Sequence, residues 1–241
     1  MKRVYVDLHI HSALSPCADN DMTPHNIVQM SLLKNLDMIA VTDHNAIGNV
    51  KAALAAAKGE NIIVVPGIEI TTQEEVHLLG YFPSLSKIET FYEVIRPHLP
   101  GKENRPDIFG NQYLFNENDE LIEQDQRLLM NAIQLDFDTM VRLICRYDGI
   151  PVPAHVNRDS FSVYSNMGFI PSDLPIRTIE LAQNLKHVSS FFTQAELTAY
   201  HQLYSSDAHN LGNILERVFF VELEIISIAA LLVWMNRAIM E

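Results

Sequence analysis

The pattern of apolar and polar positions predicts β-strands that alternate with α-helices along the chain. Residues 4–10 alternate apolar and polar side chains, which is the period-2 pattern of a strand. The continuous apolar runs at 38–41 and 62–66 are typical of strands covered on both faces. Further strands are predicted at 76–81, 151–155, 177–181, 202–206 and 218–223, and helices at about 24–36, 47–58, 84–96, 120–134, 138–148 and 226–238.

This alternation indicates an α/β fold with a parallel sheet and about seven strand–helix units. We expect a closed (β/α) barrel rather than an open doubly wound sheet, because unusual polar residues follow nearly every predicted strand. In a barrel those strand ends converge on one mouth. The whole chain, 1–241, then forms a single domain. Residues 97–134 contain several Pro, Gly and Asn, and we interpret them as an insertion and a candidate lid.

Composition limits the classes of partner. The chain has 17 Lys and Arg against 30 Asp and Glu, which gives a net charge of −13. This acidity makes nucleic acid and anionic membranes unlikely partners, because both are bound through basic residues. The apolar run at 225–235 is shorter than the ~20 residues that a membrane span needs. We interpret it as a packed helix that covers the barrel or joins two copies in a homo-oligomer.

The chain has two cysteines, Cys17 and Cys145, which are too few for a disulfide framework. We expect free thiols in a reducing compartment. The first residues run directly into the predicted first strand, with no signal peptide between them. Together these features predict a cytoplasmic protein.

Histidines and carboxylates gather at the predicted strand ends. His9 and His11 lie two residues apart on the first strand, so both side chains project from one face and can hold one metal ion. Asp207 and His209 repeat this spacing late in the chain. A lone histidine near a strand is more often a hydrogen-bonded core residue, but that explanation would have to hold for every member of the set. The remaining members are Asp19, His44, Glu69, His77 and His155.

Glu69 is the most informative member of this set. It lies in Pro-Gly-Ile-Glu-Ile, an apolar context that predicts burial. A buried carboxylate without a partner costs several kcal/mol, so a cation, an arginine or backbone donors must offset it. Zinc takes three or four protein groups, so the full set predicts two or three ions, and Glu69 can bridge two of them. Imidazole and carboxylate ligands without thiolate leave zinc, manganese and iron as candidates.

The order of these residues resembles the PHP (polymerase and histidinol phosphatase) superfamily of metal-dependent phosphoesterases. The likeness rests on Asp7-Leu-His9-Ile-His11-Ser12, Thr42-Asp43-His44, Gly67-Ile-Glu69, His77 with Leu-Leu-Gly-Tyr after it, Pro153-Ala-His155 with Arg158, and Ser206-Asp207-Ala-His209. The resemblance implies a distorted (β/α)7 barrel, with a trinuclear metal site at the C-terminal ends of the strands. The implied ligands are His9, His11, Glu69 and Asp207 for the first metal, Glu69, His77 and His155 for the second, and Asp19, His44 and His209 for the third.

The resemblance also implies a reaction. A hydroxide shared by two metals attacks the phosphorus of a small phosphomonoester. The catalytic residues that it implies are Glu69, Arg158, Asp207 and His209. The substrate stays open among a nucleotide, a sugar phosphate and histidinol phosphate. The alternative from another class is a metal-binding regulatory protein without turnover.

Two kinds of supporting residue are expected around the ligands. In many family members a proline follows the histidine that here is His155, whereas this chain continues to Arg158. A guanidinium can bind two phosphate oxygens at once, so Arg158 is the expected phosphate clamp, with a surface salt bridge as the alternative. Asp7 and Asp43 are expected to orient ligand histidines, with ordinary strand-end hydrogen bonds as the alternative.

Overall fold

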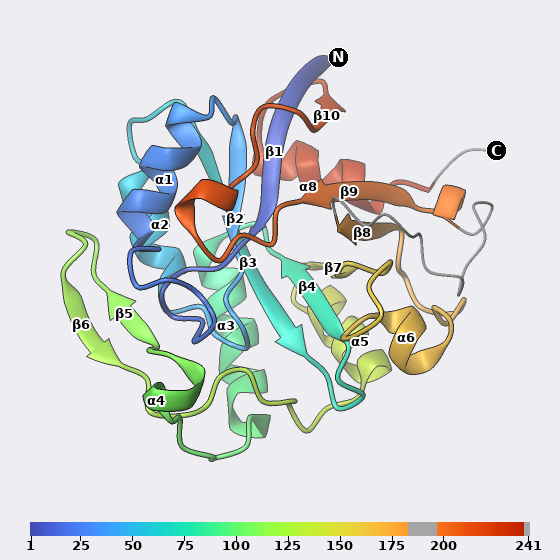
Figure 1. Ribbon diagram of the computed structural model, residues 1–241. Helices are drawn as coiled ribbons and strands as arrows, with labels where there is room; N and C mark the ends of the chain where they lie inside the picture. Colours follow the sequence, from blue (N-terminus) through green and yellow to red (C-terminus); the bar gives the residue numbers. More distant parts are fainter. Residues whose placement is uncertain (183–196, 239–241) are drawn as a thin grey trace.

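The computed structural model describes residues 1–182 and 197–238. A curved sheet organises the fold (Figure 1). In spatial order its strands are β10 (Phe220–Leu223), β1 (Lys2–Ile10), β2 (Met38–Val41), β3 (Ile63–Thr71), β4 (His77–Tyr81) and β7 (Ile150–Pro153). A second, parallel pair consists of β8 (Thr178–Ala182) and β9 (His201–Ser205).

The β8–β9 pair lies between the β7 side and the β1 side of the curved sheet. The Val156 amide, just after β7, donates to the Glu180 carbonyl on β8 at 2.9 Å. The His11 amide, just after β1, donates to the Ala208 carbonyl beyond β9 at 2.9 Å. The mixed α/β fold is therefore curled in the manner of a distorted barrel, as expected. The exact (β/α)7 repeat is not reproduced, because a short turn and no helix joins β3 to β4.

The expectation of a purely parallel sheet is wrong for β4 and β10. β4 runs antiparallel to both β3 and β7, and β10 runs antiparallel to β1. Only residues 72–76 join β3 to β4, and a parallel crossover needs a dozen or more residues. Within this turn Glu75 adopts a left-handed backbone conformation, with a φ of 58°. As a result His77 begins its strand yet pairs with Thr71 at the end of β3.

Helices cover the sheet on several sides, and buried apolar residues fill the layers between them. α1 and α2 pack against β1–β3, α3 and α5 pack against the β3–β4 hairpin, and α8 packs against the strands around β1 and β10 (Figure 1). Thr23 caps α1 ahead of Pro24, as the sequence predicts. The helices are α1 (Pro24–Leu33), α2 (Val50–Ala56), α3 (Leu85–Ile95), α5 (Phe137–Arg146), α6 (Val163–Met167) and α8 (Ile228–Asn236). Among the described residues, no helix is long and apolar enough to cross a membrane.

Residues 97–134 leave the sheet and return to it, but the predicted helix at 120–134 is wrong. The segment contains α4 (Pro106–Phe109) and a hairpin of β5 (Tyr113–Phe115) and β6 (Leu121–Gln124), after the short 3-10 turn η1 (Arg96–His98). Four apolar residues in this segment have helical spacing in the sequence, namely Leu121, Ile122, Leu128 and Leu129. In the structure the first two are exposed on the hairpin and the last two are buried.

The β5–β6 hairpin packs beside the loop that follows β1. The Tyr113 amide donates to the Ala13 carbonyl at 2.7 Å, and the Asn49 side-chain amide donates to the Tyr113 carbonyl at 3.0 Å. In Figure 1 the hairpin projects at the lower left, next to α1 and α2. These contacts make the segment a support for the 12–22 loop. Its role as a lid stays a prediction.

Candidate metal centre

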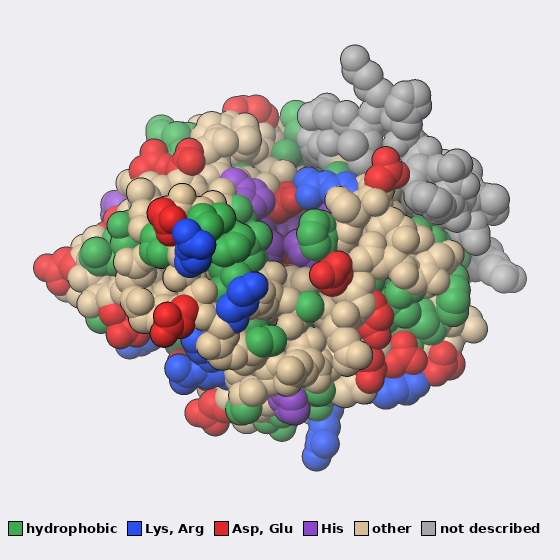
Figure 2. Space-filling model, turned by 60° about the horizontal axis from the view of Figure 1, so that its bottom comes forward, with side chains coloured by type: hydrophobic (Ala, Val, Ile, Leu, Met, Phe, Trp, Pro, Cys, Tyr) green, Lys and Arg blue, Asp and Glu red, His purple; other side chains and the backbone are tan. Residues whose placement is uncertain are grey.

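The predicted ligands, apart from Asp19, come together on one side of the curled sheet. Figure 2 looks onto this face, where histidine side chains lie in a hollow next to acidic and basic groups. The sources of the ligands are β1 and its end for His9 and His11, the end of β2 for His44, β3 for Glu69, the start of β4 for His77, the loop after β7 for His155, and the loop after β9 for Asp207 and His209.

Glu69 lies at the centre of this group and is fully buried. Imidazole nitrogens surround both of its carboxylate oxygens. The nitrogen–oxygen distances are 2.9 Å for His44 and His77, 3.3 Å for His9 and His11, and 3.5 Å for His155. None of these contacts has hydrogen-bond geometry, so both Glu69 oxygens lack a hydrogen-bond partner although they are buried.

Buried polar atoms without partners are rare and require an explanation. Here the unpartnered oxygens of Glu69 and the convergent imidazoles fit divalent cations, which would accept electron pairs from both kinds of group. The Nε2 atoms of His9 and His11 lie only 3.1 Å apart, so both rings face one point. The described residues form three groups with metal-ligand spacing, which are His9 with His11 and Glu69, His44 with Glu69 and His77, and His11 with His44 and His209.

These three groups agree only partly with the assignment of ligands to three metals that the family resemblance implies. His11 lies within reach of two groups, and His44 lies beside Glu69 as well as beside His209. Asp19 is exposed and belongs to none of the groups among the described residues. Its backbone amide donates to the His209 carbonyl at 2.8 Å, which keeps its loop beside the site. Its assignment as a ligand stays a prediction.

Glu180 contacts two of the predicted ligands, and the sequence analysis did not single it out. It is buried on β8, and its carboxylate accepts a hydrogen bond from His9 Nδ1 at 2.9 Å and from the His155 amide at 3.1 Å. A donated Nδ1 proton leaves the Nε2 lone pair of His9 free to face the cavity. The sequence offered only the alternating Thr-Ile-Glu-Leu pattern of an ordinary strand.

A serine and an aspartate orient His11 in a similar way. His11 Nδ1 lies 2.9 Å from Ser15 Oγ, and Ser15 Oγ donates to Asp43 at 2.7 Å. The expected role of Asp43 is therefore present, but it acts through Ser15 and not directly on a ring. Asp7 accepts from the backbone amides of Ser206 and Leu215, both at 2.9 Å, and so holds the loop that carries Asp207. Its expected contact with a ligand ring is not made.

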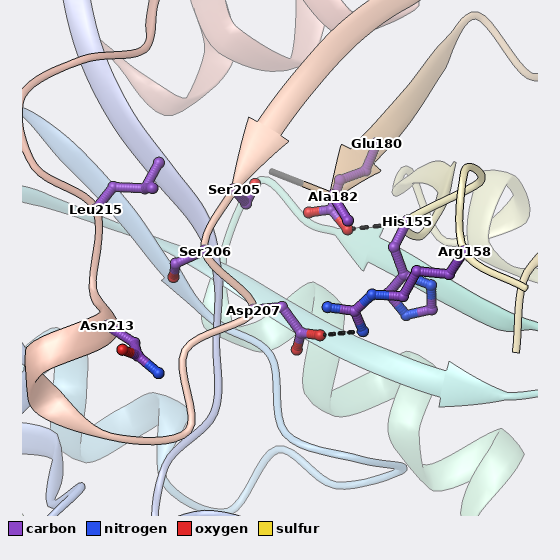
Figure 3. A pocket seen from close by; sticks show the side chains of 9 residues that line it. All are labelled: His155, Arg158, Glu180, Ala182, Ser205, Ser206, Asp207, Asn213 and Leu215. Carbon is purple, nitrogen blue, oxygen red and sulfur yellow. Dashed lines mark hydrogen bonds and ion pairs between the residues drawn. The ribbon is translucent and has the colours of Figure 1, made fainter. Parts of the chain in front are cut away.

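Asp207 connects the ligand cluster to Arg158. Its Oδ1 lies 3.3 Å from His9 Nε2 and 3.1 Å from His11 Nε2. Its other oxygen accepts from Arg158 Nη1 at 2.6 Å, as the dashed line in Figure 3 marks. Asp207 can therefore offer one oxygen to a cation while the other fixes the guanidinium at the edge of the site. Arg158 is 38% exposed, so it is reachable from solvent.

The buried charges move the pKa values of the site in opposite directions. Burial lowers the pKa of His9, but the carboxylates of Glu180, Glu69 and Asp207 outweigh it and raise this pKa well above its usual value. Burial raises the pKa of the Glu69 carboxyl, but the surrounding imidazoles hold it well below its usual value. Burial dominates at His77 and lowers its pKa to about 4. The His77 imidazole is thus neutral and ready to bind a cation, whereas a cation at His9 would have to displace the proton that the carboxylates stabilise there.

Four of the eight non-glycine residues with a positive φ among the described residues lie at this site. Positive φ angles occur at Asn45 (46°), His155 (29°), Phe161 (54°) and Asp207 (52°). Such conformations are uncommon for residues other than glycine, and they persist where the surroundings enforce them. The Asn45 side-chain amide, for example, donates to the Leu129 carbonyl at 2.7 Å, which ties the loop after β2 to the end of the 97–134 segment.

Two cavities adjoin the Arg158–Asp207 pair. One, of about 110 Å³, includes the histidine cluster together with Ser160 and Phe161. The other, of about 260 Å³, is drawn in Figure 3 and lies between the loop after β9 and the ends of β7 and β8. Asn213 and Leu215 line it at the left of this view, opposite His155 and Arg158.

A family comparison agrees with this geometry. The family model of the PHP domain matches residues 7–212, which is most of the chain and includes every predicted ligand. The chain belongs to the PHP domain family. The match thus confirms the family that the ligand order suggested.

Relatives of known name match only part of the chain. A 5'-3' exoribonuclease of Haemophilus influenzae is 32% identical over 31% of this chain and 27% of its own length. A 3',5'-nucleoside bisphosphate phosphatase of Chromobacterium violaceum is 31% identical over 31% of this chain and 26% of its own length. The chain spans between 13% and 27% of the length of these curated relatives and of a third one, from Methanocaldococcus jannaschii.

Solved structures resemble the whole chain in fold. The lesion-specific endonuclease PfuEndoQ of Pyrococcus furiosus matches with a TM-score of 0.72 and 19% identity, over 98% of this chain and 56% of that chain. A putative metal-dependent phosphoesterase of Bifidobacterium adolescentis matches with a TM-score of 0.59 and 14% identity, over 96% of both chains. At these identities the likeness concerns the fold alone.

Proposed function

We propose that this PHP-domain chain is a metal-dependent phosphoesterase that hydrolyses a small phosphomonoester. The observation that carries the proposal is Glu69, a fully buried carboxylate whose two oxygens lack hydrogen-bond partners among convergent imidazoles. Such a group is stable only if cations or protons offset its charge. Two or three divalent ions of zinc, manganese or iron fit the donor set.

The residues that would hold these ions are His9, His11, His44, Glu69, His77, His155, Asp207 and His209, with Asp19 as a further candidate. When bound, the cations lower the pKa of coordinated water and offset negative charge on a phosphate. The protein contributes fixed geometry. Glu180 and the Ser15–Asp43 pair hold the rings of His9 and His11, so the lone pairs of these rings stay directed at one point.

Arg158 is proposed to bind the phosphate. Asp207 already holds one edge of its guanidinium at 2.6 Å, and the remaining N–H donors stay available to a substrate. Arg158 lines both cavities, so a phosphate beside it reaches the ligand cluster, and its organic group has space in either cavity. A guanidinium fixed in this way stabilises the negative charge that develops on the phosphate oxygens during phosphoryl transfer. Glu69, Asp207 and His209 complete the proposed catalytic group.

The proposed substrate is a nucleotide, a sugar phosphate or histidinol phosphate. The name of the Chromobacterium relative favours a nucleotide, and the larger cavity of about 260 Å³ beside Arg158 offers space for an organic group. The net charge of −13 still disfavours long nucleic acids.

A second candidate is a nuclease that hydrolyses phosphodiesters. The fold of PfuEndoQ, a lesion-specific endonuclease by name, matches 98% of this chain, and a solved complex of Endonuclease Q contains a 27-mer duplex substrate with an abasic lesion. This likeness favours a nucleic-acid partner, whereas the net charge of −13 disfavours one. The two candidates differ in the bond that is cut, so one panel of substrates separates them.

The experiment is a hydrolysis assay of the metal-loaded protein. The substrates are adenosine monophosphate, adenosine 3',5'-bisphosphate, ribose 5-phosphate, histidinol phosphate and a 5'-phosphorylated oligonucleotide. We expect phosphate release from one of the small substrates and a loss of more than about 100-fold for Glu69→Gln, because its charge and one potential ligand oxygen are removed. Cleavage of the oligonucleotide alone would favour the nuclease. Full metal occupancy without hydrolysis of any substrate would favour the metal-binding regulatory protein.

A further inference from the structure

We propose that Phe161 forms an aromatic wall of the substrate site and stacks against the base of a nucleotide substrate. The proposal rests on the phosphoesterase function proposed above and selects one of its substrate classes. It is carried by the position of one ring, by the backbone that holds this ring, and by the neighbours on the same loop.

The Phe161 ring lies at the edge of the ligand cluster. It stacks on the imidazole of His77, with ring centroids 4.9 Å apart and an angle of 28° between the planes. It lines the same cavity of about 110 Å³ as Glu69. Nevertheless, 45% of Phe161 is exposed. A ring that covers a ligand histidine and still presents a large exposed area offers a stacking surface to a second flat group.

The backbone holds this exposed ring at an energetic cost. Phe161 has a φ of 54°, a conformation that is a clear outlier for a bulky side chain. Its carbonyl accepts a hydrogen bond from the His77 amide at 2.9 Å. The Ser162 hydroxyl donates to the Arg158 carbonyl at 2.7 Å and closes the loop. Strain of this kind accumulates at functional sites, and an exposed phenylalanine gains little burial to offset it.

The loop from His155 to Ser162 brings three separate groups to one place. His155 faces Glu69, Arg158 holds Asp207, and Phe161 stacks on a ligand histidine. Arg158 and Phe161 line the same cavity. When the organic group of a phosphate bound by Arg158 extends along this smaller cavity, it lies next to an exposed aromatic ring. A base suits this ring better than a sugar does, because every base has a flat π-face.

The experiment measures binding to the metal-loaded protein by isothermal titration calorimetry. The probes are non-hydrolysable 5'-methylenephosphonate analogues of adenosine monophosphate and of ribose 5-phosphate, and the phosphonate analogue of histidinol phosphate. We expect the adenosine analogue to bind at least about tenfold more tightly than the ribose analogue, from the usual contribution of one base–aromatic stack. Phe161→Leu should abolish this preference, whereas Phe161→Tyr should keep it. The metal content of all three proteins is measured alongside.

Equal binding of the adenosine and ribose analogues, or a preference that survives in Phe161→Leu, overturns the proposal. An equal loss of affinity for all three probes in Phe161→Leu also overturns it, because Phe161 would then only support His77. Tighter binding of the histidinol analogue overturns the assignment to nucleotides. A Phe161-dependent preference for adenosine in a protein that hydrolyses no phosphoester supports the stacking and contradicts the proposed function, so the two failures can be distinguished.

Discussion

Glu180 shows that the candidate metal centre depends on residues that orient the ligands as well as on the ligands themselves. The hydrogen bond from His9 Nδ1 joins residues that are 171 positions apart in the sequence. The same carboxylate accepts the His155 amide, so one side chain positions two predicted ligands. Groups that orient metal ligands in this way contribute strongly to metal affinity.

Replacement of Glu180 by glutamine should weaken metal binding. Glutamine keeps the shape of the side chain but removes the charge that holds the Nδ1 proton of His9. We expect metal affinity to fall by about 10- to 100-fold, measured by competition with a chromophoric chelator. Glu222→Gln on the exposed side of β10 is the matched control and should have no effect. Unchanged affinity in Glu180→Gln would exclude this orienting role.

Single residues also mark the limit of what the sequence could predict. Strand-end histidines and carboxylates were recognisable because their chemistry is unusual beside apolar runs, and the structure brings His9, His11 and Glu69 together. Glu180 was not recognisable, because a glutamate in an alternating strand normally faces solvent. Asp7 has a carboxylate that could orient a ligand histidine, but that carboxylate accepts hydrogen bonds from the backbone amides of a distant loop.

At the scale of elements, the 97–134 segment supports the loop that carries Ser15. Gly110 lies where this segment meets the loop and has a φ of 103°. A Cβ atom at this position would lie 1.9 Å from the Pro16 carbonyl oxygen. The contact is with backbone, so a side chain there cannot simply rotate away.

Gly110→Ala should therefore lower the free energy of unfolding by more than about 1 kcal/mol, because it adds both a clash and an unfavourable φ. Denaturant unfolding measures the loss. Gly101→Ala is the control, since nothing lies within 4 Å of its Cβ position and no positive φ is required. It should change stability by no more than about 0.5 kcal/mol. Equal effects of the two substitutions would contradict the close contact at Pro16.

The N-terminus of α5 gives a prediction with a defined pH dependence. The Asp136 carboxylate accepts from the Thr139 amide at 2.7 Å, and this hydrogen bond lowers the pKa of Asp136. A lowered folded-state pKa stabilises the protein above the unfolded-state pKa, and the stabilisation is lost as pH falls through the folded-state pKa. In metal-free protein, Asp136→Ala should cost about 1 kcal/mol at pH 7 and less near pH 3, measured by urea unfolding. Asp136→Asn keeps the cap, so its stability should lack this pH dependence.

The sequence predicted most elements because their patterns are local. The strands at 38–41 and 150–153 and the helix at 24–33 lie close to their predicted positions. The direction of β4 was not predicted, since it depends on the length of a turn and on a partner strand rather than on apolar periodicity. The helix predicted at 120–134 failed because two pairs of leucine and isoleucine residues share a helical spacing by coincidence and face different surroundings.

At the scale of the whole molecule, the proposed ions connect parts of the chain that are far apart. The ligands come from β1, β2, β3 and β4 and from the loops after β7 and β9, so bound metal would hold both sides of the curled sheet together. At a free metal concentration of 100 times Kd, binding adds about 2.7 kcal/mol to stability. A chelator should thus lower Tm by roughly 5–10 °C in differential scanning calorimetry. Glu69→Gln should show a smaller shift, and an identical Tm with and without chelator would contradict a metal that binds the native fold.

The reversed direction of β4 also bears on the order in which the fold forms. The β3–β4 hairpin places Glu69 and His77 together through local contacts, whereas the junction of β1 with the β9 loop joins His11 to Ala208. Loop-closure entropy favours the local pairing, so we expect the hairpin to form early and the junction late. Glu75 holds the turn at a φ of 58°, so Glu75→Gly should accelerate refolding of the metal-free protein in stopped-flow measurements. In that order, the first part of the fold to appear already contains Glu69 and His77, two of the three residues of one ligand group.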